Sequence, residues 1–235
     1  FSVGIAPILQ YGSLDINYNM LGTPSSTKGV AQDFGAGYTV GAAYESAGLT
    51  VGASYKSAID MKYDGQISVA ASQFSGGALV LSDNLEQPAE MGVGVSYKMG
   101  QHTFAVDYKK IKWSDAKGYK DFKWEDQNVY MFGYQFAQDN WALRAGYNYA
   151  KSPIKDQGVA TDGGLTNTLN LLGFPAIIEK HYTVGGSYAF TKMTSLDLAY
   201  VYSPEKTDTY ANMMGGNITT KHSQDAVTAQ LNFNF

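Results

Sequence analysis

Apolar and polar side chains alternate one residue at a time along most of this chain. Between 91 and 98, Met, Val, Val and Tyr occupy the odd positions, while Gly, Gly, Ser and Lys occupy the even ones. A period of two over eight or more residues is typical of a half-buried β-strand. Across the whole chain the alternation predicts eleven strands, at 1–10, 13–19, 36–46, 48–57, 88–99, 102–112, 126–138, 141–151, 180–191, 194–203 and 225–235.

The connections between these strands are alternately short and long. Short connections are expected at 11–13, 46–48, 99–101, 138–140 and 191–193, and long ones at 19–35, 58–87, 113–125, 152–179 and 204–224. Transmembrane barrels have short turns at one end and long loops at the other. A soluble sandwich or barrel has no reason to sort its loops in this way. The pattern therefore predicts one all-β domain over residues 1–235, a transmembrane antiparallel up-and-down β-barrel.

Hydropathy and aromatic residues fit this fold. The mean hydropathy is −0.23, and no apolar run reaches the roughly 18 residues of a membrane-spanning helix. That test detects helices only, because barrel strands alternate apolar and polar residues. Aromatic residues such as Tyr44, Tyr97, Trp141 and Tyr202 lie near the ends of predicted strands. They indicate girdles at the membrane interfaces, whereas in a soluble sandwich the same residues would form the core.

The composition limits the chemistry. The 235 residues include no cysteine, so neither disulfides nor thiolate sites are possible. His102, His181 and His222 are far apart and lack metal-ligand spacing. Carboxylates at 60 and 64, or at 121, 125 and 126, could form a patch that binds calcium or bridges lipopolysaccharide, but they lack EF-hand spacing. A net charge of −4 argues against a nucleic-acid partner. We expect no metal, cofactor or nucleic acid.

The strand count and the last residue carry two further expectations. Closed bacterial barrels normally have an even number of strands. The last predicted strand follows a long connection, which places the C-terminus on the periplasmic side, and parity then predicts further residues before Phe1. Phe235 closes the last strand. A terminal Phe resembles the signal by which the barrel-assembly machinery recognises outer-membrane barrels.

Several segments resemble one known family. They are 37–45 (GYTVGAAYE), 49–57 (LTVGASYKS), 87–91 (QPAEM), 139–146 (DNWALRAG), 181–190 (HYTVGGSYAF) and the closing NFNF. In this order, over about residues 35–235, they resemble the FadL/TodX family. The resemblance implies outer-membrane transport of long-chain fatty acids or aromatic hydrocarbons. It also implies a fourteen-stranded barrel with an N-terminal hatch, of which the hatch and the first three strands lie outside this sequence.

Two of the expected long loops are unusually apolar, and exposed apolar patches often mark binding sites. In the second loop, Leu165, Leu169 and Leu172 have helical spacing. The structural alternative is that each loop folds inward and buries these residues against the barrel. The substrate-binding candidates are Phe74, Leu79 and Leu81 in the first loop, and Leu169, Leu172, Phe174 and Ile177 in the second.

A fatty acid also carries a carboxylate, which needs a cationic partner once it leaves water. The resemblance implies a carboxylate-contacting lysine just before the strand at 126–138, where Lys120 and Lys123 are the nearest matches. The alternative is that these lysines are solvated or bind lipopolysaccharide phosphates. Arg144 is the one arginine of the chain. Its strand position points it into the lumen, where it could line the route.

The expected function is passive, facilitated uptake of hydrophobic small molecules across the bacterial outer membrane. An enzyme is not expected, because no histidine has an evident Ser or Asp partner. A general diffusion porin remains one alternative, although porins carry an arginine-and-acid constriction and this chain has a single arginine. The other alternative is a structural or adhesive barrel with no transport.

Overall fold

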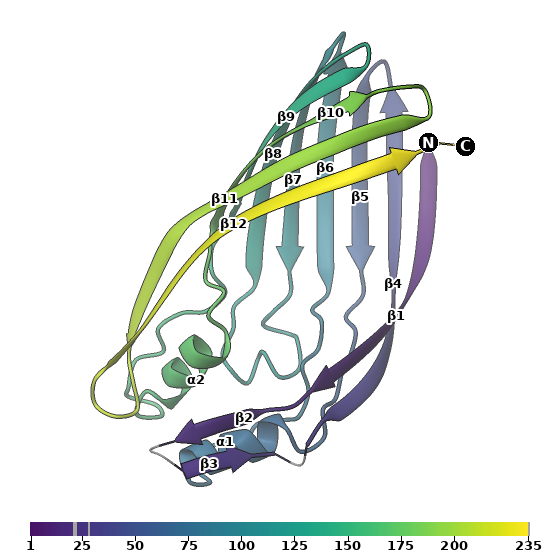
Figure 1. The fold of residues 1–235 in the computed structure, drawn as a ribbon. Helices are drawn as coiled ribbons and strands as arrows, with labels where there is room; N and C mark the ends of the chain where they lie inside the picture. Colours follow the sequence, from purple (N-terminus) through teal and green to yellow (C-terminus); the bar gives the residue numbers. More distant parts are fainter. Residues whose placement is uncertain (21–22, 28, 235) are drawn as a thin grey trace.

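The chain folds into one large antiparallel sheet (Figure 1). The computed structural model describes residues 1–20, 23–27 and 29–234. Each strand of the sheet pairs with the next one along the chain. The ten strands are β1 (Ser2–Leu14), β4 (Ala31–Ser46), β5 (Leu49–Lys56), β6 (Glu90–Met99), β7 (His102–Ile111), β8 (Gln127–Gln138), β9 (Trp141–Ala150), β10 (Lys180–Ala189), β11 (Thr194–Ala211) and β12 (Asn217–Phe233).

The two helices and the small second sheet lie at one end of the molecule (Figure 1). A small hairpin of β2 (Asn17–Met20) and β3 (Thr23–Ser26) joins β1 to β4. Helix α1 (Ile67–Ser75) follows β5, and helix α2 (Leu165–Gly173) follows β9. Figure 1 shows both helices and the small hairpin at the end opposite to the start of β1 and the end of β12. We call the two ends the long-loop end and the short-turn end.

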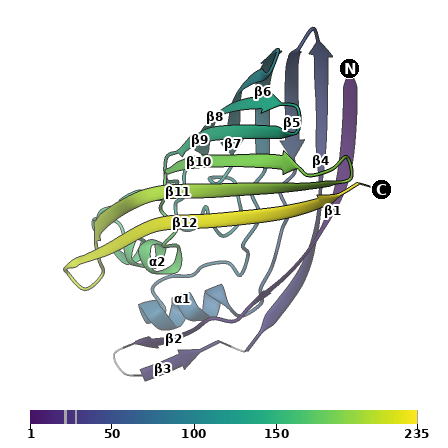
Figure 2. The same cartoon turned by 45° about the horizontal axis from the view of Figure 1, so that its top comes forward.

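The sheet curls around an interior, so that β10, β11 and β12 face the strands from β4 to β8 (Figure 2). Within the described residues, β1 and β12 do not pair with each other, and the sheet is open between these two edge strands. No helix of the described residues is long and apolar enough to cross a membrane.

The two faces of the sheet differ in chemistry. The outer face presents large apolar side chains, among them Val93, 55% exposed, and Val227, 78% exposed. The inner face carries small or polar residues at the intervening positions, such as Gly94 and Gln135. Apolar residues outside and polar ones inside are typical of transmembrane barrels and opposite to a soluble sandwich. The all-β barrel-type architecture is therefore confirmed.

The turn expected at 11–13 is wrong, which explains why the main sheet has ten strands instead of about eleven. β1 runs without a break from Ser2 to Leu14 and pairs along its whole length with β4. Gly12 serves a close contact instead of a turn. A Cβ atom there would lie 2.2 Å from the Tyr63 hydroxyl oxygen and 3.0 Å from the Met61 methyl group. The expectation of further residues before Phe1 used an odd number of strands, and the main sheet of ten strands does not support that number.

The long loop expected at 204–224 is also wrong. β11 and β12 continue through it as one extended hairpin, closed by a short turn at 212–216. The register shifts between Ser203 and Lys206, so a bulge accommodates Pro204, which cannot donate a ladder hydrogen bond. Of the five short connections expected, the four at 46–48, 99–101, 138–140 and 191–193 are present, and the one at 11–13 is absent. The predicted role of Phe235 in barrel assembly concerns a residue outside the described ones.

The long connections fold back over the interior and build the hydrophobic core there. After β5, Ile59, Met61 and Tyr63 are buried against the inner side of β1. A second cluster joins Ile67 of α1 with the other loops, and a third packs Leu171 of α2 against the sheet. The core therefore lies at the long-loop end and holds the two helices in place.

Candidate functional site

An apolar pocket of about 640 Å³ opens between the two helices. The end of β1 and the segment after it form one wall, α1 a second, and α2 with the residues that follow it a third. Its described lining residues are Leu14, Asp15, Ile16, Asn17, Tyr18, Asn19, Ile67, Ala70, Ala71, Phe74, Leu81, Leu85, Phe122, Leu169, Leu172, Gly173 and Phe174. The size and apolar lining are those of a site for a small hydrophobic ligand.

Helix α2 buries polar residues beside two of its leucines, Leu165 and Leu171. Asn167 and Asn170 are almost completely buried, whereas Leu172 is 59% exposed. Leu165 and Leu171 of the same helix are buried, as expected of an amphipathic helix, so the exposed Leu172 is the exception. The buried amides are satisfied: Asn167 Nδ2 donates to the carbonyl oxygen of Ala211 at 3.1 Å, and Asn170 Nδ2 donates to that of Phe122 at 2.9 Å. Polar contacts thus fix the helix and leave its Leu169–Leu172 edge for the pocket.

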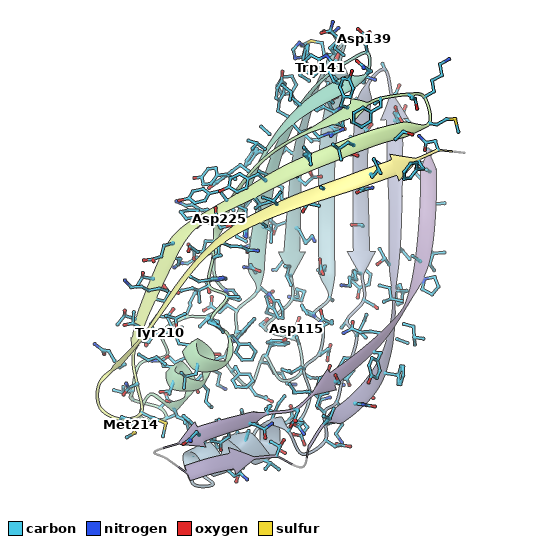
Figure 3. The ribbon with its side chains drawn as sticks, viewed as in Figure 1. Asp115, Asp139, Trp141, Tyr210, Met214 and Asp225 are labelled. Atoms are coloured by element: carbon cyan, nitrogen blue, oxygen red, sulfur yellow. The ribbon has the colours of Figure 1, made fainter. Side chains whose placement is uncertain are left out.

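The β11–β12 hairpin supplies the support behind α2. The backbone N–H of Met213 donates to Thr168 Oγ1 at 3.0 Å, and Thr220 Oγ1 donates to the carbonyl of Leu171 at 3.0 Å. Figure 3 shows Tyr210 of β11 beside α2 and Met214 at the tip of the hairpin. The extension of β11 and β12 beyond the expected strand ends therefore positions one wall of the pocket.

Aspartates from neighbouring loop positions cap both helices. Asp83 accepts hydrogen bonds from the backbone N–H groups of Ser68 and Gly65 at 2.8 and 2.9 Å. Asp162 accepts one from the N–H of Thr166 at 3.0 Å. Burial works to raise the pKa of each carboxyl group, but these hydrogen bonds outweigh it and hold both pKa values below the usual range. Negative charge at a helix N-terminus is also favourable.

Phe122 and Phe174 form the floor of the pocket, and further aromatic rings pack behind them. The Phe174 ring contacts Phe122 at 5.2 Å, Trp124 at 5.0 Å and Tyr119 at 5.8 Å between centroids. Trp124 Nε1 donates to Asn170 Oδ1 at 2.9 Å, which ties this floor to α2. Burial raises the pKa of Tyr119, so its phenol stays neutral. Such edge-to-face packing gives a firm, apolar surface on which aromatic ligands can stack.

The structure brings together most of the apolar candidate residues from two distant loops. Phe74, Leu81, Leu169, Leu172 and Phe174 all line the pocket. Two other candidates lie elsewhere: Leu79 packs against the cluster around Ile67, and Ile177 is 1% exposed in the cluster with Ile154 and Leu171.

Other lining residues were missing from the sequence-based set. Leu14 is the last residue of β1, and Ile16 and Tyr18 come just after it. The sequence did not reveal where this strand ends, although the two-residue spacing was a usable signal. Phe122 lies in a lysine-rich segment, and the surrounding charges gave no indication that this residue lines a pocket.

The cationic candidates do not converge on the pocket. Lys120 and Lys123 are exposed on the loop between β7 and β8 and are not lining residues. Arg144 lines a separate recess of about 440 Å³ on the inner face. There, Arg144 Nε donates to Gln135 Oε1 at 2.8 Å, and its guanidinium lies 3.5 Å from Asp197. The ionisable side chains among the described lining residues of the apolar pocket are Asp15 and Tyr18.

Four of the five carboxylates considered for calcium or lipopolysaccharide pair with lysines, and the fifth, Asp121, accepts a hydrogen bond from the Ser82 hydroxyl. Asp126 lies 2.7 Å from Lys112 Nζ and 3.4 Å from Lys110 Nζ, and Ser114 Oγ donates to it at 2.7 Å. Burial opposes ionisation, but these contacts outweigh it and lower the pKa of Asp126 to about 2. Asp60 pairs with Lys117. In the part of the chain that the structure describes, no group of three or more His, Asp or Glu side chains could hold a metal ion.

Comparisons with known proteins agree with this architecture. The family model of the outer membrane protein transport proteins (OMPP1/FadL/TodX) matches residues 6–235. The toluene transporter TodX of P. putida superposes with a TM-score of 0.64 at 18% identity, over 99% of this chain and 65% of that one. The Ralstonia pickettii toluene transporter TbuX gives 0.58 at 15% identity, over 98% and 63%.

A third similar structure is a FadL homologue from Pseudomonas aeruginosa, with a TM-score of 0.55 at 17% identity over 97% of this chain and 61% of that one. The chain thus spans less than two thirds of each of these three proteins. No curated protein sequence matches it. The match of the family model over nearly the whole chain shows that it belongs to the OMPP1/FadL/TodX family of outer-membrane transport proteins.

Proposed function

We propose that the pocket between α1 and α2 captures hydrophobic small molecules from outside the cell, for passive, facilitated diffusion through the barrel. The observation that carries this proposal is the exposed Leu172 edge of helix α2. Its amides are buried and satisfied, and Leu172 remains exposed opposite an aromatic floor. An apolar edge kept in contact with water costs free energy in the empty state, which a hydrophobic ligand recovers on binding.

The proposal sets the orientation of the protein in the membrane. A capture site has to face the medium, so the long-loop end is extracellular, and the short-turn end with the end of β12 is periplasmic. The alternation of short turns and longer connections agrees with the usual arrangement of outer-membrane barrels.

Uncharged ligands fit this pocket better than carboxylates do. The described lining includes Asp15 but no lysine or arginine, and a bound carboxylate there would lack a counter-charge. The contacts that Phe174 makes with Phe122 and Trp124 favour an aromatic ring. Aromatic hydrocarbons are therefore preferred over long-chain fatty acids, in keeping with the toluene transport printed for TodX and TbuX.

A binding measurement on the full-length protein tests the proposal. Substitution Leu172→Asn adds a polar group to an exposed pocket position, so the fold is retained while saturable toluene binding weakens about tenfold or more. Val80→Asn is the matched control, because Val80 is 89% exposed and does not line the pocket. Saturable toluene binding that is unchanged in Leu172→Asn would contradict the proposal. Oleate binding equal to that of toluene would contradict the preference for uncharged ligands.

A general diffusion porin is the second candidate, and one observation favours it. On the inner face, Gln135, Arg144, Asp197 and Asn232 form a hydrogen-bonded polar row across β8, β9, β11 and β12. Such a wall suits hydrophilic solutes. Single-channel recording separates the two functions: a porin gives a steady ionic conductance that Arg144→Ala changes, whereas a hydrocarbon channel gives binding without it.

A further inference from the structure

A row of tyrosines crosses the outer face of β9, β10 and β11. Tyr147, Tyr182 and Tyr202 stand opposite one another in the register of these strands. Their rings are neighbours, with centroids 5.1 Å apart between Tyr147 and Tyr182 and 6.5 Å apart between Tyr182 and Tyr202. Tyrosine favours the boundary between hydrocarbon and headgroups, because its ring is apolar and its hydroxyl is polar. This row marks the edge of the apolar band.

Lysines follow the tyrosine row toward the long-loop end. On β10, Lys180 is the next outward position after Tyr182, and it stands opposite Tyr149 of β9. Lys151 follows Tyr149 by one further outward position, and Lys221 lies on the same face of β12. All three lysines are exposed. Lys180 is one outward step of two residues beyond the row, about 7 Å along its strand. Lys151 and Lys221 are two such steps beyond it, about 14 Å. These ammonium groups therefore lie beyond the apolar band, on its headgroup side.

These lysines keep their charge available. Lys151 and Lys180 pair with no carboxylate among the described residues, and Lys221 Nζ lies 3.9 Å from Glu205 Oε1 with its side chain 63% exposed. The band therefore carries three positive charges and two nearby carboxylates, Glu205 and Asp225, of which Asp225 accepts a hydrogen bond from the Tyr200 hydroxyl.

The lysines at the end of β7 differ from these three, because they are paired with a carboxylate. On β7 and the start of β8, Lys110 and Lys112 both contact Asp126 Oδ2, at 3.4 and 2.7 Å. Their positive charges are paired with this carboxylate within the protein. Among the described residues, the available positive charge on the outer face is therefore concentrated on β10, on β12 and directly after β9.

We propose that Lys151, Lys180 and Lys221 form a binding surface for the phosphate groups of lipid A in the outer leaflet. We call this surface the lysine belt. Lysine stems lie along apolar surface and extend their ammonium groups toward the headgroups, where the phosphates of lipid A supply complementary charge. The choice of the outer leaflet rests on the orientation proposed above. The belt is separate from the pocket, and its function does not depend on which ligand the pocket takes.

The test compares two variants of the full-length protein in detergent. Lys151→Gln/Lys180→Gln/Lys221→Gln removes the belt, and Lys98→Gln/Lys192→Gln removes two exposed lysines at the short-turn end. Binding of diphosphorylated lipid A is followed by native mass spectrometry and by the shift of the unfolding temperature. Because each lysine near an anionic surface contributes to binding, the belt variant should bind at least tenfold more weakly, and the control should bind like the parent protein.

Three outcomes would overturn the proposal. The first is unchanged binding in the belt variant, and the second is an equal loss in the control variant, which would indicate nonspecific charge. The third is equal binding of lipid A without phosphates or of phosphatidylglycerol. Equal binding of lipid A without phosphates would indicate that the acyl chains are recognised. Equal binding of phosphatidylglycerol would indicate that any anionic lipid is accepted. Toluene binding measured in the same samples stays at the parent level, so failure of the belt and failure of the pocket are distinguishable.

Discussion

Substitution Asn170→Ala should detach the two walls of the pocket from each other without unfolding the barrel. Asn170 is 1% exposed and joins α2 to the loop between β7 and β8 through two hydrogen bonds. Its Oδ1 accepts from Trp124 Nε1, and its Nδ2 donates to the Phe122 carbonyl, each at 2.9 Å. Alanine removes both bonds and leaves two polar groups with no partner near α2.

The structure gives the size of the effect. A buried donor or acceptor left without a partner costs about 1–3 kcal/mol. The Phe122 carbonyl bond is buried, while the Trp124 bond is only partly buried and its indole can turn to water. We therefore expect about 2 kcal/mol, which corresponds to roughly thirty-fold more frequent opening of this region.

Hydrogen exchange is the assay that resolves the region from the rest of the chain. Amides of α2 and of residues 119–124 should exchange roughly thirty-fold faster in Asn170→Ala, while those of β6 and β7 should keep their parent rates. Asn140→Ala is the control, because its side-chain bond to the Ala189 carbonyl is exposed and 3.3 Å long. Exchange in α2 that rises less than threefold, or rises equally in β6, would refute the reasoning.

Two further predictions concern the pH response and a glycine. The pKa values of Asp83 and Asp162 are lower in the folded protein than in the unfolded chain. Their stabilisation is therefore complete above about pH 4 and is lost as the pH falls through the folded pKa values. Amide exchange in α1 and α2 should accelerate over that range, and Asp83→Asn should remove the response in α1. The substitution Gly12→Ala should cost about 1–3 kcal/mol through overpacking, because the new Cβ would lie 2.2 Å from the Tyr63 hydroxyl. Adding Tyr63→Phe should restore part of that loss in denaturant unfolding, and no restoration would show that Tyr63 is not the obstacle.

The alternation of the sequence predicts most of the sheet because each outer position faces lipid and each inner position does not. It fails where one residue type has two uses. Gly12 suggests a turn by composition, yet the glycine is required by Tyr63, a residue 51 positions away that only the fold brings near. Pro204 suggests a loop, yet a bulge accommodates it. Beyond the tyrosine row, the outer positions of β11 are polar, at Thr207 and Thr209, so the apolar signal ends before the strand does.

The pocket shows why its leucines could be found from the sequence and its support could not. The spacing of Leu169 and Leu172 predicts that they share a helix face, and local geometry alone is sufficient for that. Whether this face points to the core or to a ligand depends on which partners receive the other face. Here Asn167 and Asn170 find carbonyl groups on β11 and on the loop between β7 and β8, both distant in sequence. Asn167, Asn170 and Leu171 thus attach α2 to the barrel, and the exposed Leu172 is left for a function that does not need to stabilise the fold.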